Sequence, residues 1–512
     1  MPVLAEPRPP SRGERRFTAA VAAGPLPGAA AAVRGGLFVL VARAGIQGLQ
    51  LLVLLWLARL LPPREFGLVA LITAVLGAGQ LVQDLGLSAA TVQRPDLRHG
   101  EASTLFWITV ALSALLSLLG LLLAPLLAAF YQEPSITPLA LALALGFLLG
   151  GAGAQHRALL LRQQRHRRLA LIGLLSTAAG CLSALWLAHQ GAGAWALVAQ
   201  QLVGGLLATV LLWQASPLSP DRFQISPAVR EMLRFGGHFL GFRLLGYGAH
   251  NLQVVLVGRE LGAASAALFT RAYWLAQQAL GYANDTAGQL AQAALPRRLE
   301  DPAAFERYYL RSLHAVLLAT APLAALCLGY GDRLIGLLFG PAWGASGELL
   351  RILAVGMWVQ PVLYSTGWLY TARGETRALL RWGLFGWTVM ILASLIGLQQ
   401  GLPGLAWAWS LGQWALLLPG CALAWRGPGI RPSAVLAVAA PPLLAALLAL
   451  ALSWPLLPDP GRASPALGLL PVLGVFALVY PAAVLVWPGQ RPLILPLLAA
   501  VWPRHPLSAS RS

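Results

Sequence analysis

The stretch "LFVLVARAGIQGLQLLVLLWLA" (residues 37–58) is almost entirely apolar and, at about 20 residues, is long enough to cross a bilayer as a helix. Similar runs recur along the whole chain of 512 residues, which is 58% hydrophobic and only 11% charged. Few windows between these runs are polar enough to form a water-facing domain. We therefore predict an all-α polytopic membrane protein. The opening stretch also holds Arg43, a permanent cation inside an otherwise apolar segment.

The hydrophobic pattern predicts fourteen transmembrane helices. Short polar or glycine-rich segments such as "HQGAG" and "QQGLPG" separate neighbouring helices. The predicted ranges are 36–60, 66–92, 102–131, 136–160, 169–189, 192–215, 235–258, 263–290, 308–330, 345–371, 379–400, 402–425, 433–456 and 466–488.

The distribution of arginine supports this topology. All 36 basic residues are Arg, and the formal net charge is +18. With fourteen helices and both termini in the cytoplasm, 27 arginines lie on the cytoplasmic side, five on the other side and four within spans. The positive-inside rule explains such a bias without nucleic acid as a partner. We expect a multi-pass membrane protein with both termini in the cytoplasm.

An internal repeat becomes visible when the sequence is shifted by 200 residues. Segment 33–61 then matches 233–261 without a gap, and three arginines and two glycines coincide: Arg34, Arg43, Arg59, Gly36 and Gly48 with Arg234, Arg243, Arg259, Gly236 and Gly248. The repeat predicts two parallel lobes of six helices each, related by an axis along the membrane normal, plus two extra C-terminal helices.

The repeat also predicts how the chain is divided. Residues 1–34 hold a cluster of arginines and then small residues interrupted by Gly and Pro, so we expect a disordered cytoplasmic arm rather than a signal peptide. The remaining predicted parts are an N-lobe (35–215), a cytoplasmic linker (216–233), a C-lobe (234–425), helices 13 and 14 (426–488) and a cytoplasmic tail (489–512).

Ionisable residues inside membrane spans are costly and are therefore candidates for function. Arg43 and Asp84 both lie roughly 13 to 15 Å in from flanking cytoplasmic arginines, at about 1.5 Å per residue. Arg243 and Asp285 occupy similar depths in the second copy. Each pair either joins adjacent helices, or its arginine faces a cavity and binds phosphate oxygens while the aspartate releases it or binds a coupling cation, Na⁺ or H⁺.

Two further arginines, Arg271 and Arg351, lie nearer the outer ends of their spans. They either extend to the membrane interface or act as outer anion ligands. The densest basic run, "QHRALLLRQQRHRR" (155–168), is explained by topology and by anionic membrane lipid, or by first contact with a phosphorylated lipid substrate. The sequence contains no metal, nucleotide or nucleophile motif, so we expect no cofactor beyond a coupling cation, and no enzyme activity.

Several segments resemble the lipopolysaccharide and exopolysaccharide exporters of the multidrug/oligosaccharidyl-lipid/polysaccharide flippase superfamily. The similarity runs collinearly over about 35–425, through "LARLLPPREFGLVAL" (57–71), "QDLGLSAATVQRPDL" (83–97), "AFYQEPSITPL" (129–139), "GAWALVAQQL" (193–202), "LRFGGHFLG" (233–241), "LVGRELGAASAALFTRAYWLA" (256–276) and "LIGLLFGPAW" (334–343). The resemblance implies a V-shaped fold of two lobes and alternating access.

The resemblance also implies a substrate and partners. Such proteins carry polyprenyl-diphosphate-linked oligosaccharide from the cytoplasmic to the periplasmic leaflet, alongside polysaccharide polymerases and glycosyltransferases. Relatives that flip a lipid-linked precursor use cavity arginines for the diphosphate, and Arg43 and Arg243 are the counterparts by location.

Two other classes are alternatives. A drug antiporter of the same superfamily typically has twelve spans and an acidic, cation-selecting cavity. A membrane-embedded glycosyltransferase or ligase needs a large extramembrane loop or a pair of carboxylates outside the lipid. Fourteen predicted spans, an excess of arginine at depth and short loops argue against both.

Overall fold

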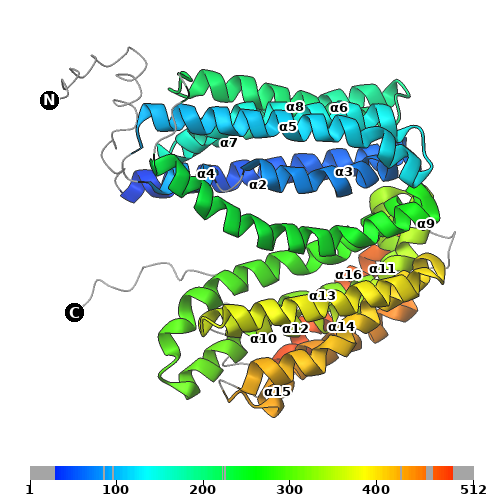
Figure 1. Cartoon of the computed structure of the whole chain (residues 1–512). Coiled ribbons are helices and arrows are strands. Elements are labelled where there is room, and N and C mark those ends of the chain that lie inside the picture. Colours follow the sequence, from blue (N-terminus) through cyan, green and yellow to red (C-terminus); the bar gives the residue numbers. More distant parts are fainter. Residues whose placement is uncertain are drawn as a thin grey trace, which may run out of the picture. The chain divides into compact units, whose positions relative to one another are not determined.

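The computed structural model describes residues 29–84, 87–94, 97–221, 223, 227–426, 429–456 and 465–487, and the regular elements among them are helices (Figure 1). The α-helices are α2 (Ala29–Leu60), α3 (Pro63–Asp84), α4 (Leu87–Gln93), α5 (His99–Tyr131), α6 (Ile136–Arg162), α7 (His166–His189), α8 (Trp195–Ala215), α9 (Pro227–Ala294), α10 (Pro302–Phe339), α11 (Gly344–Met357), α12 (Gln360–Ala372), α13 (Thr376–Leu398), α14 (Gly401–Arg426), α15 (Pro432–Ser453) and α16 (Pro465–Val486). Three short 3-10 helices, η1 (Pro296–Arg298), η2 (Pro341–Trp343) and η3 (Trp454–Leu456), complete the set. The prediction of an all-α chain is confirmed.

The described residues contain fewer candidate membrane spans than the sequence predicts. Within the described ranges, eleven helices are long and apolar enough to cross a membrane, or twelve if the bent pair Pro341–Met357 and Gln360–Ala372 is one span. Two predicted spans, 235–258 and 263–290, fall in the single long helix α9, which contributes one candidate, Gly246–Gln278. The predicted span 402–425 corresponds to α14, which is not one of these candidates. Its four tryptophans are typical of the membrane interface rather than of the apolar centre of a bilayer. The count of fourteen is therefore not confirmed.

Some helix boundaries also differ from the prediction. The first helix begins at Ala29 instead of residue 36, because four consecutive alanines favour helix. It thus includes the end of the predicted arm; residues 1–28, and the predicted tail 489–512, lie outside the described residues. The predicted span 66–92 is wrong as one helix, since α3 ends at Asp84 and α4 starts at Leu87.

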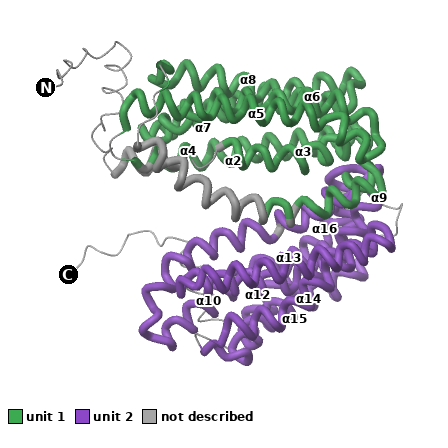
Figure 2. Tube along the Cα trace, viewed as in Figure 1, with its two compact units in different colours: residues 1–267 green, residues 268–512 purple. Residues whose placement is uncertain are grey.

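The chain divides into two compact units, Met1–Ala267 and Leu268–Ser512 (Figure 2). The division lies inside α9, five residues after Gly262, whose φ of 83° and ψ of 174° interrupt the helix. An L side chain is strained at this φ, so a glycine is required. The division at 267/268 lies further along the chain than the predicted linker 216–233, of which only part is described.

Contacts of α9 explain why its first half belongs to the N-terminal unit. The Tyr247 hydroxyl donates to the Thr73 carbonyl of α3 at 2.8 Å. The Arg259 guanidinium lies over the Phe130 ring, 5.4 Å from its centroid, and donates to the Phe130 carbonyl at 2.5 Å near the end of α5. Apolar lipid offers no competing hydrogen bonds, so such bonds fix helix positions within a membrane.

Small residues allow close packing inside the N-terminal unit, where α5, α6 and α8 run side by side (Figure 1). A Cβ at Gly151 of α6 would lie 2.1 Å from the Ser113 hydroxyl of α5, and one at Gly120 would lie 2.8 Å from Ala144. Helices in lipid associate through such small-residue contacts because there is no hydrophobic driving force between them.

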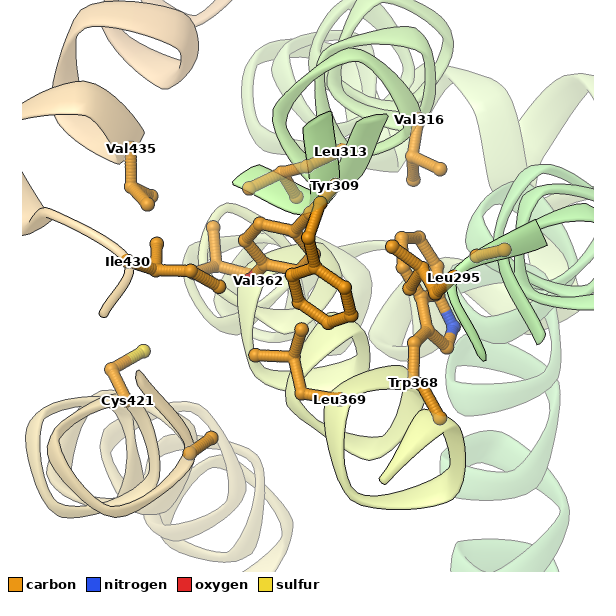
Figure 3. Close-up of a cluster of buried hydrophobic side chains, with 14 of the residues drawn as sticks. Leu295, Tyr309, Leu313, Val316, Val362, Trp368, Leu369, Cys421, Ile430 and Val435 are labelled. Atoms are coloured by element: carbon orange, nitrogen blue, oxygen red, sulfur yellow. The ribbon is translucent and has the colours of Figure 1, made fainter. Parts of the chain in front are cut away.

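A buried apolar cluster joins α10, α12, α14 and α15 in the C-terminal unit (Figure 3). Tyr309 lies in this cluster with its ring fully buried. Its hydroxyl is 2.7 Å from the Ser365 hydroxyl and accepts a hydrogen bond from Trp425 at 3.2 Å. The last two helices, α15 and α16, both pack against α10.

Candidate functional site: a polar pocket and intramembrane arginines

A pocket of about 330 Å³ lies within the N-terminal unit, between α3, α6 and α8. Each of these helices is long and apolar enough to span a membrane, so the pocket lies at membrane depth. Its lining mixes amides, a hydroxyl, glycines and a few apolar side chains: Thr73, Leu76, Gly77, Gln80, Gln83, Leu143, Gly146, Phe147, Gly150, Gln201 and Leu202.

Three glutamines give the pocket its polarity. The Gln83 amide donates to the Ser113 hydroxyl at 2.8 Å and to the Phe147 carbonyl at 2.6 Å. Gln80 and Gln201 are exposed, and no hydrogen bond joins either of them to another described residue. An exposed amide inside a membrane span is costly unless it meets a polar partner, so both side chains are suited to bind water or a polar ligand. Sequence reasoning missed them, although glutamine inside an apolar span is itself a signal.

The α3 wall of the pocket is also where α9 docks. Thr73 and Gly77 line the pocket, and Tyr247 contacts both, since a Cβ at Gly77 would lie 2.1 Å from its hydroxyl. Gly77 leaves the Thr73 carbonyl, four residues earlier in the helix, accessible to Tyr247. The pocket and the first half of α9 thus share one surface.

Arg43 is exposed on α2, which packs on α7. The side chains of Asp84 and Arg243 lie outside the described residues, so the proposed partners of Arg43 and of Asp285 stay predictions. Asp285 is itself exposed on α9. An exposed guanidinium on an apolar helix faces either lipid or an aqueous space, and the former is far more costly.

The two outer arginines have different surroundings. Arg271 is half-buried on α9. Two residues further along this helix, the ring of Tyr273 meets that of Trp409 edge to face at 5.7 Å. Arg351 of α11 donates to Asp332 of α10 at 3.1 Å and to the Leu328 carbonyl at 3.2 Å. We predicted that Arg351 extends to the membrane interface or binds an anion, and neither prediction included this ion pair with Asp332.

One member of the basic run has a structural role. Arg162 donates to the carbonyls of Thr91, at 3.1 Å, and of Arg94, so its charge caps the C-terminal end of the short helix α4. Arg157, Arg167 and Arg168 are exposed, as the expected contact with lipid head groups requires. Arg167 also lies over the Phe38 ring of α2, 4.9 Å from its centroid.

Metal ligands do not gather in the described ranges, where no group of three or more His, Cys, Asp or Glu could hold a metal ion. The fold and the site thus define a multi-pass helical membrane protein with a polar pocket enclosed by apolar helices and an exposed arginine at membrane depth.

Comparison with known proteins agrees with this class. The sequence profile of the family described as polysaccharide biosynthesis protein matches residues 56–348, and the chain belongs to this family. It is 24% identical over 370 residues to the lipopolysaccharide biosynthesis protein WzxC of Escherichia coli K12, covering 72% of this chain and 75% of WzxC. It is 25% identical over 343 residues to the teichuronic acid biosynthesis protein TuaB of Bacillus subtilis 168, covering 65% of this chain and 69% of TuaB.

Solved structures support the fold. The lipid II flippase MurJ, in an inward closed conformation, matches with a TM-score of 0.65 at 11% identity, over 91% of this chain and all of that one. An inward-facing multidrug resistance MATE family transporter of the MOP superfamily matches with a TM-score of 0.57 at 18% identity, over 74% and 94%. These likenesses concern the fold, while the family profile and the two relatives confirm the expected resemblance to transport proteins of polysaccharide biosynthesis.

Proposed function

We propose that this chain is a flippase that moves polyprenyl-diphosphate-linked oligosaccharide from the cytoplasmic to the periplasmic leaflet by alternating access. The family profile and the relatives WzxC and TuaB, named for lipopolysaccharide and teichuronic acid biosynthesis, support a saccharide substrate. A diphosphate joined to sugars does not cross hydrocarbon unaided. Translocation breaks no covalent bond, so the protein needs binding groups rather than catalytic ones.

The observation that carries the proposal is the exposure of Arg43 on the apolar helix α2. A guanidinium presents five donors in a planar fork that matches phosphate oxygens. The repeat places Arg243 at the corresponding position of the second copy. We propose that both arginines bind the diphosphate, with Arg271 and Arg351 as additional anion ligands further along the path.

The same proposal includes topology and energy coupling. Fourteen spans in two parallel lobes, with both termini in the cytoplasm, account for the arginine bias. Asp84 and Asp285 release the arginines from substrate or bind a coupling Na⁺ or H⁺. Polysaccharide polymerases and glycosyltransferases that make and consume the lipid-linked oligosaccharide are the proposed partners.

A complementation assay in a strain that lacks its own exporter tests the role of the arginines. Arg43→Ala with Arg243→Ala should abolish surface polysaccharide, whereas Arg377→Ala, which removes an exposed arginine at the start of α13, should leave it unchanged. Normal polysaccharide from the double variant at equal protein level would contradict the proposal.

A second comparison separates substrate binding from a purely structural ion pair. If Arg43 acts on substrate, Arg43→Ala combined with Asp84→Ala is as inactive as Arg43→Ala alone. Recovery of polysaccharide in the combined variant would mean that the arginine only neutralises the aspartate.

The alternative, a drug antiporter, has less support. The MATE likeness concerns the fold, whereas the family profile and both relatives point to polysaccharide. An antiporter would lower the sensitivity of a drug-susceptible host to cationic dyes, and we expect no such change on expression of this chain.

A further inference from the structure

The pocket between α3, α6 and α8 has a chemistry that differs from that of the intramembrane arginines. The described residues of its lining include three primary amides and one threonine, and none of them is acidic or basic. A phosphate or a cation would find no charged partner among these described residues, so its desolvation cost would be high. A neutral ligand with many hydroxyls has a much lower desolvation cost than either ion.

Amides are the side chains best matched to hydroxyl groups. Each primary amide offers two donors and a carbonyl acceptor, and each sugar hydroxyl both donates and accepts. Gln80 and Gln201 lie on different helices, α3 and α8, and both are exposed at the pocket. A ring that carries several hydroxyls can therefore bond to both walls at once.

Gln83 is held in one orientation. Its Nε2 donates to Ser113 and to the Phe147 carbonyl, which uses both amide hydrogens. Its carbonyl Oε1 is then the group left to accept from a ligand hydroxyl. The amide lies directly over Gly150, where a Cβ would be 3.0 Å from Nε2 and 3.1 Å from Oε1.

The size and surface of the pocket fit one small ring. A volume of about 330 Å³ is at the lower end of the roughly 300–1,000 Å³ of ligand sites. Leu76, Leu143 and Leu202 add apolar surfaces to the pocket, and Phe147 adds an aromatic one. Such surfaces suit the apolar C–H face of a pyranose.

We propose that this pocket binds a neutral sugar residue of the lipid-linked substrate, through the amides of Gln80, Gln83 and Gln201. The inference rests on the proposed function and adds a saccharide site to it. Tyr247 bonds to the α3 wall of the pocket, and Arg243 precedes it by four residues in the same helix. Recognition of sugar and of diphosphate thus involves adjoining parts of the chain.

Calorimetric titration of the purified full-length protein tests the site. The probes are farnesyl diphosphate and its glucosyl, galactosyl and N-acetylglucosaminyl derivatives, and the measured quantity is the ratio of Kd values without and with the sugar. We expect at least one sugar to tighten wild-type binding about tenfold or more, as two or more hydrogen bonds provide. In Gln80→Leu/Gln201→Leu, that ratio should fall to about one while farnesyl diphosphate binds as before.

Two further variants control for folding and position. Gln200→Leu removes the neighbouring amide, which contacts Cys181 of α7 and does not line the pocket, and should keep the wild-type ratio. Gln80→Asn/Gln201→Asn keeps two amides at shorter reach and should give an intermediate ratio if the leucine variant does not fold.

The outcomes separate the two proposals. A wild-type ratio in either pocket variant, or no preference for any sugar in the wild type, would overturn the saccharide site and leave the diphosphate proposal intact. Absence of binding by all four probes would contradict the proposed function and the saccharide site together.

Discussion

At the scale of single residues, a histidine supplies the donor that a proline removes. Pro442 lies inside α15 and has no N–H, so the Val438 carbonyl four residues earlier lacks its helical donor. Nδ1 of His314, from α10, lies 3.0 Å from that carbonyl oxygen. Because a carbonyl only accepts, His314 donates. Tyr480 of α16 does the same for the Leu318 carbonyl, at 2.8 Å, which Pro322 of α10 leaves without a donor.

This arrangement gives a double-mutant prediction. His314→Leu should lower the free energy of unfolding by about 0.5–2 kcal/mol, the range of interhelical hydrogen bonds in membranes. In a Pro442→Ala background the restored N–H satisfies Val438, so the same substitution should have a smaller effect. Thermal unfolding in detergent measures both differences, and equal losses in the two backgrounds would show that the bond to Val438 is unimportant.

The sequence alone revealed some of these residues and not others. Arg43 could be found because a charge stands out in an apolar run and recurs after 200 residues. The Arg351–Asp332 pair was missed, because its members are 19 residues apart on different helices and pair only when α10 and α11 fold back on each other. Gln80 and Gln201 were missed because three-dimensional packing, not spacing, brings them into one pocket.

At the scale of helices, the close approach of α3 and α9 depends on Gly67. A Cβ at this position would lie 1.8 Å from the Ala263 carbonyl oxygen, a backbone atom that cannot rotate away. Gly48 of α2 is also helical, but nothing lies within 4 Å of its Cβ position. Replacing each glycine by alanine should therefore have opposite effects on stability, and Gly48 serves as the matched control for Gly67.

Gly67→Ala should destabilise the protein by about 1–3 kcal/mol, as overpacking does. Gly48→Ala should be neutral or stabilise by up to about 1 kcal/mol, because alanine favours helix. Thermal unfolding in detergent compares the two variants. Equal stability of both would mean that α9 does not dock on α3 as described.

The helices themselves were largely predictable, because an apolar run of membrane length has few other folds. Their exact number was not. The break at Gly262 agrees with the predicted boundary between 258 and 263, but the polar residues in α9 and the tryptophans of α14 obscure which segments cross the membrane. The separation of α3 and α4 was also missed, since short helices do not interrupt an apolar pattern.

At the scale of the whole molecule, the arginine distribution predicts the orientation. A reporter that is active only in the cytoplasm should be active when fused after residue 512 or inserted at residue 165, since 27 of the 36 arginines are assigned to that side. It should be inactive when inserted at residue 191, in the predicted loop between α7 and α8. The reverse pattern would contradict the assigned topology.

The central claim is that the chain moves a lipid-linked saccharide across a bilayer. The most direct test is the rate at which a fluorescent, polyprenyl-diphosphate-linked saccharide becomes accessible to an impermeant quencher in proteoliposomes, with the coupling gradients imposed. We predict that the wild type raises this rate at least tenfold over protein-free liposomes, and that Arg43→Ala with Arg243→Ala abolishes the increase. Equal rates with and without the wild-type protein would contradict the account.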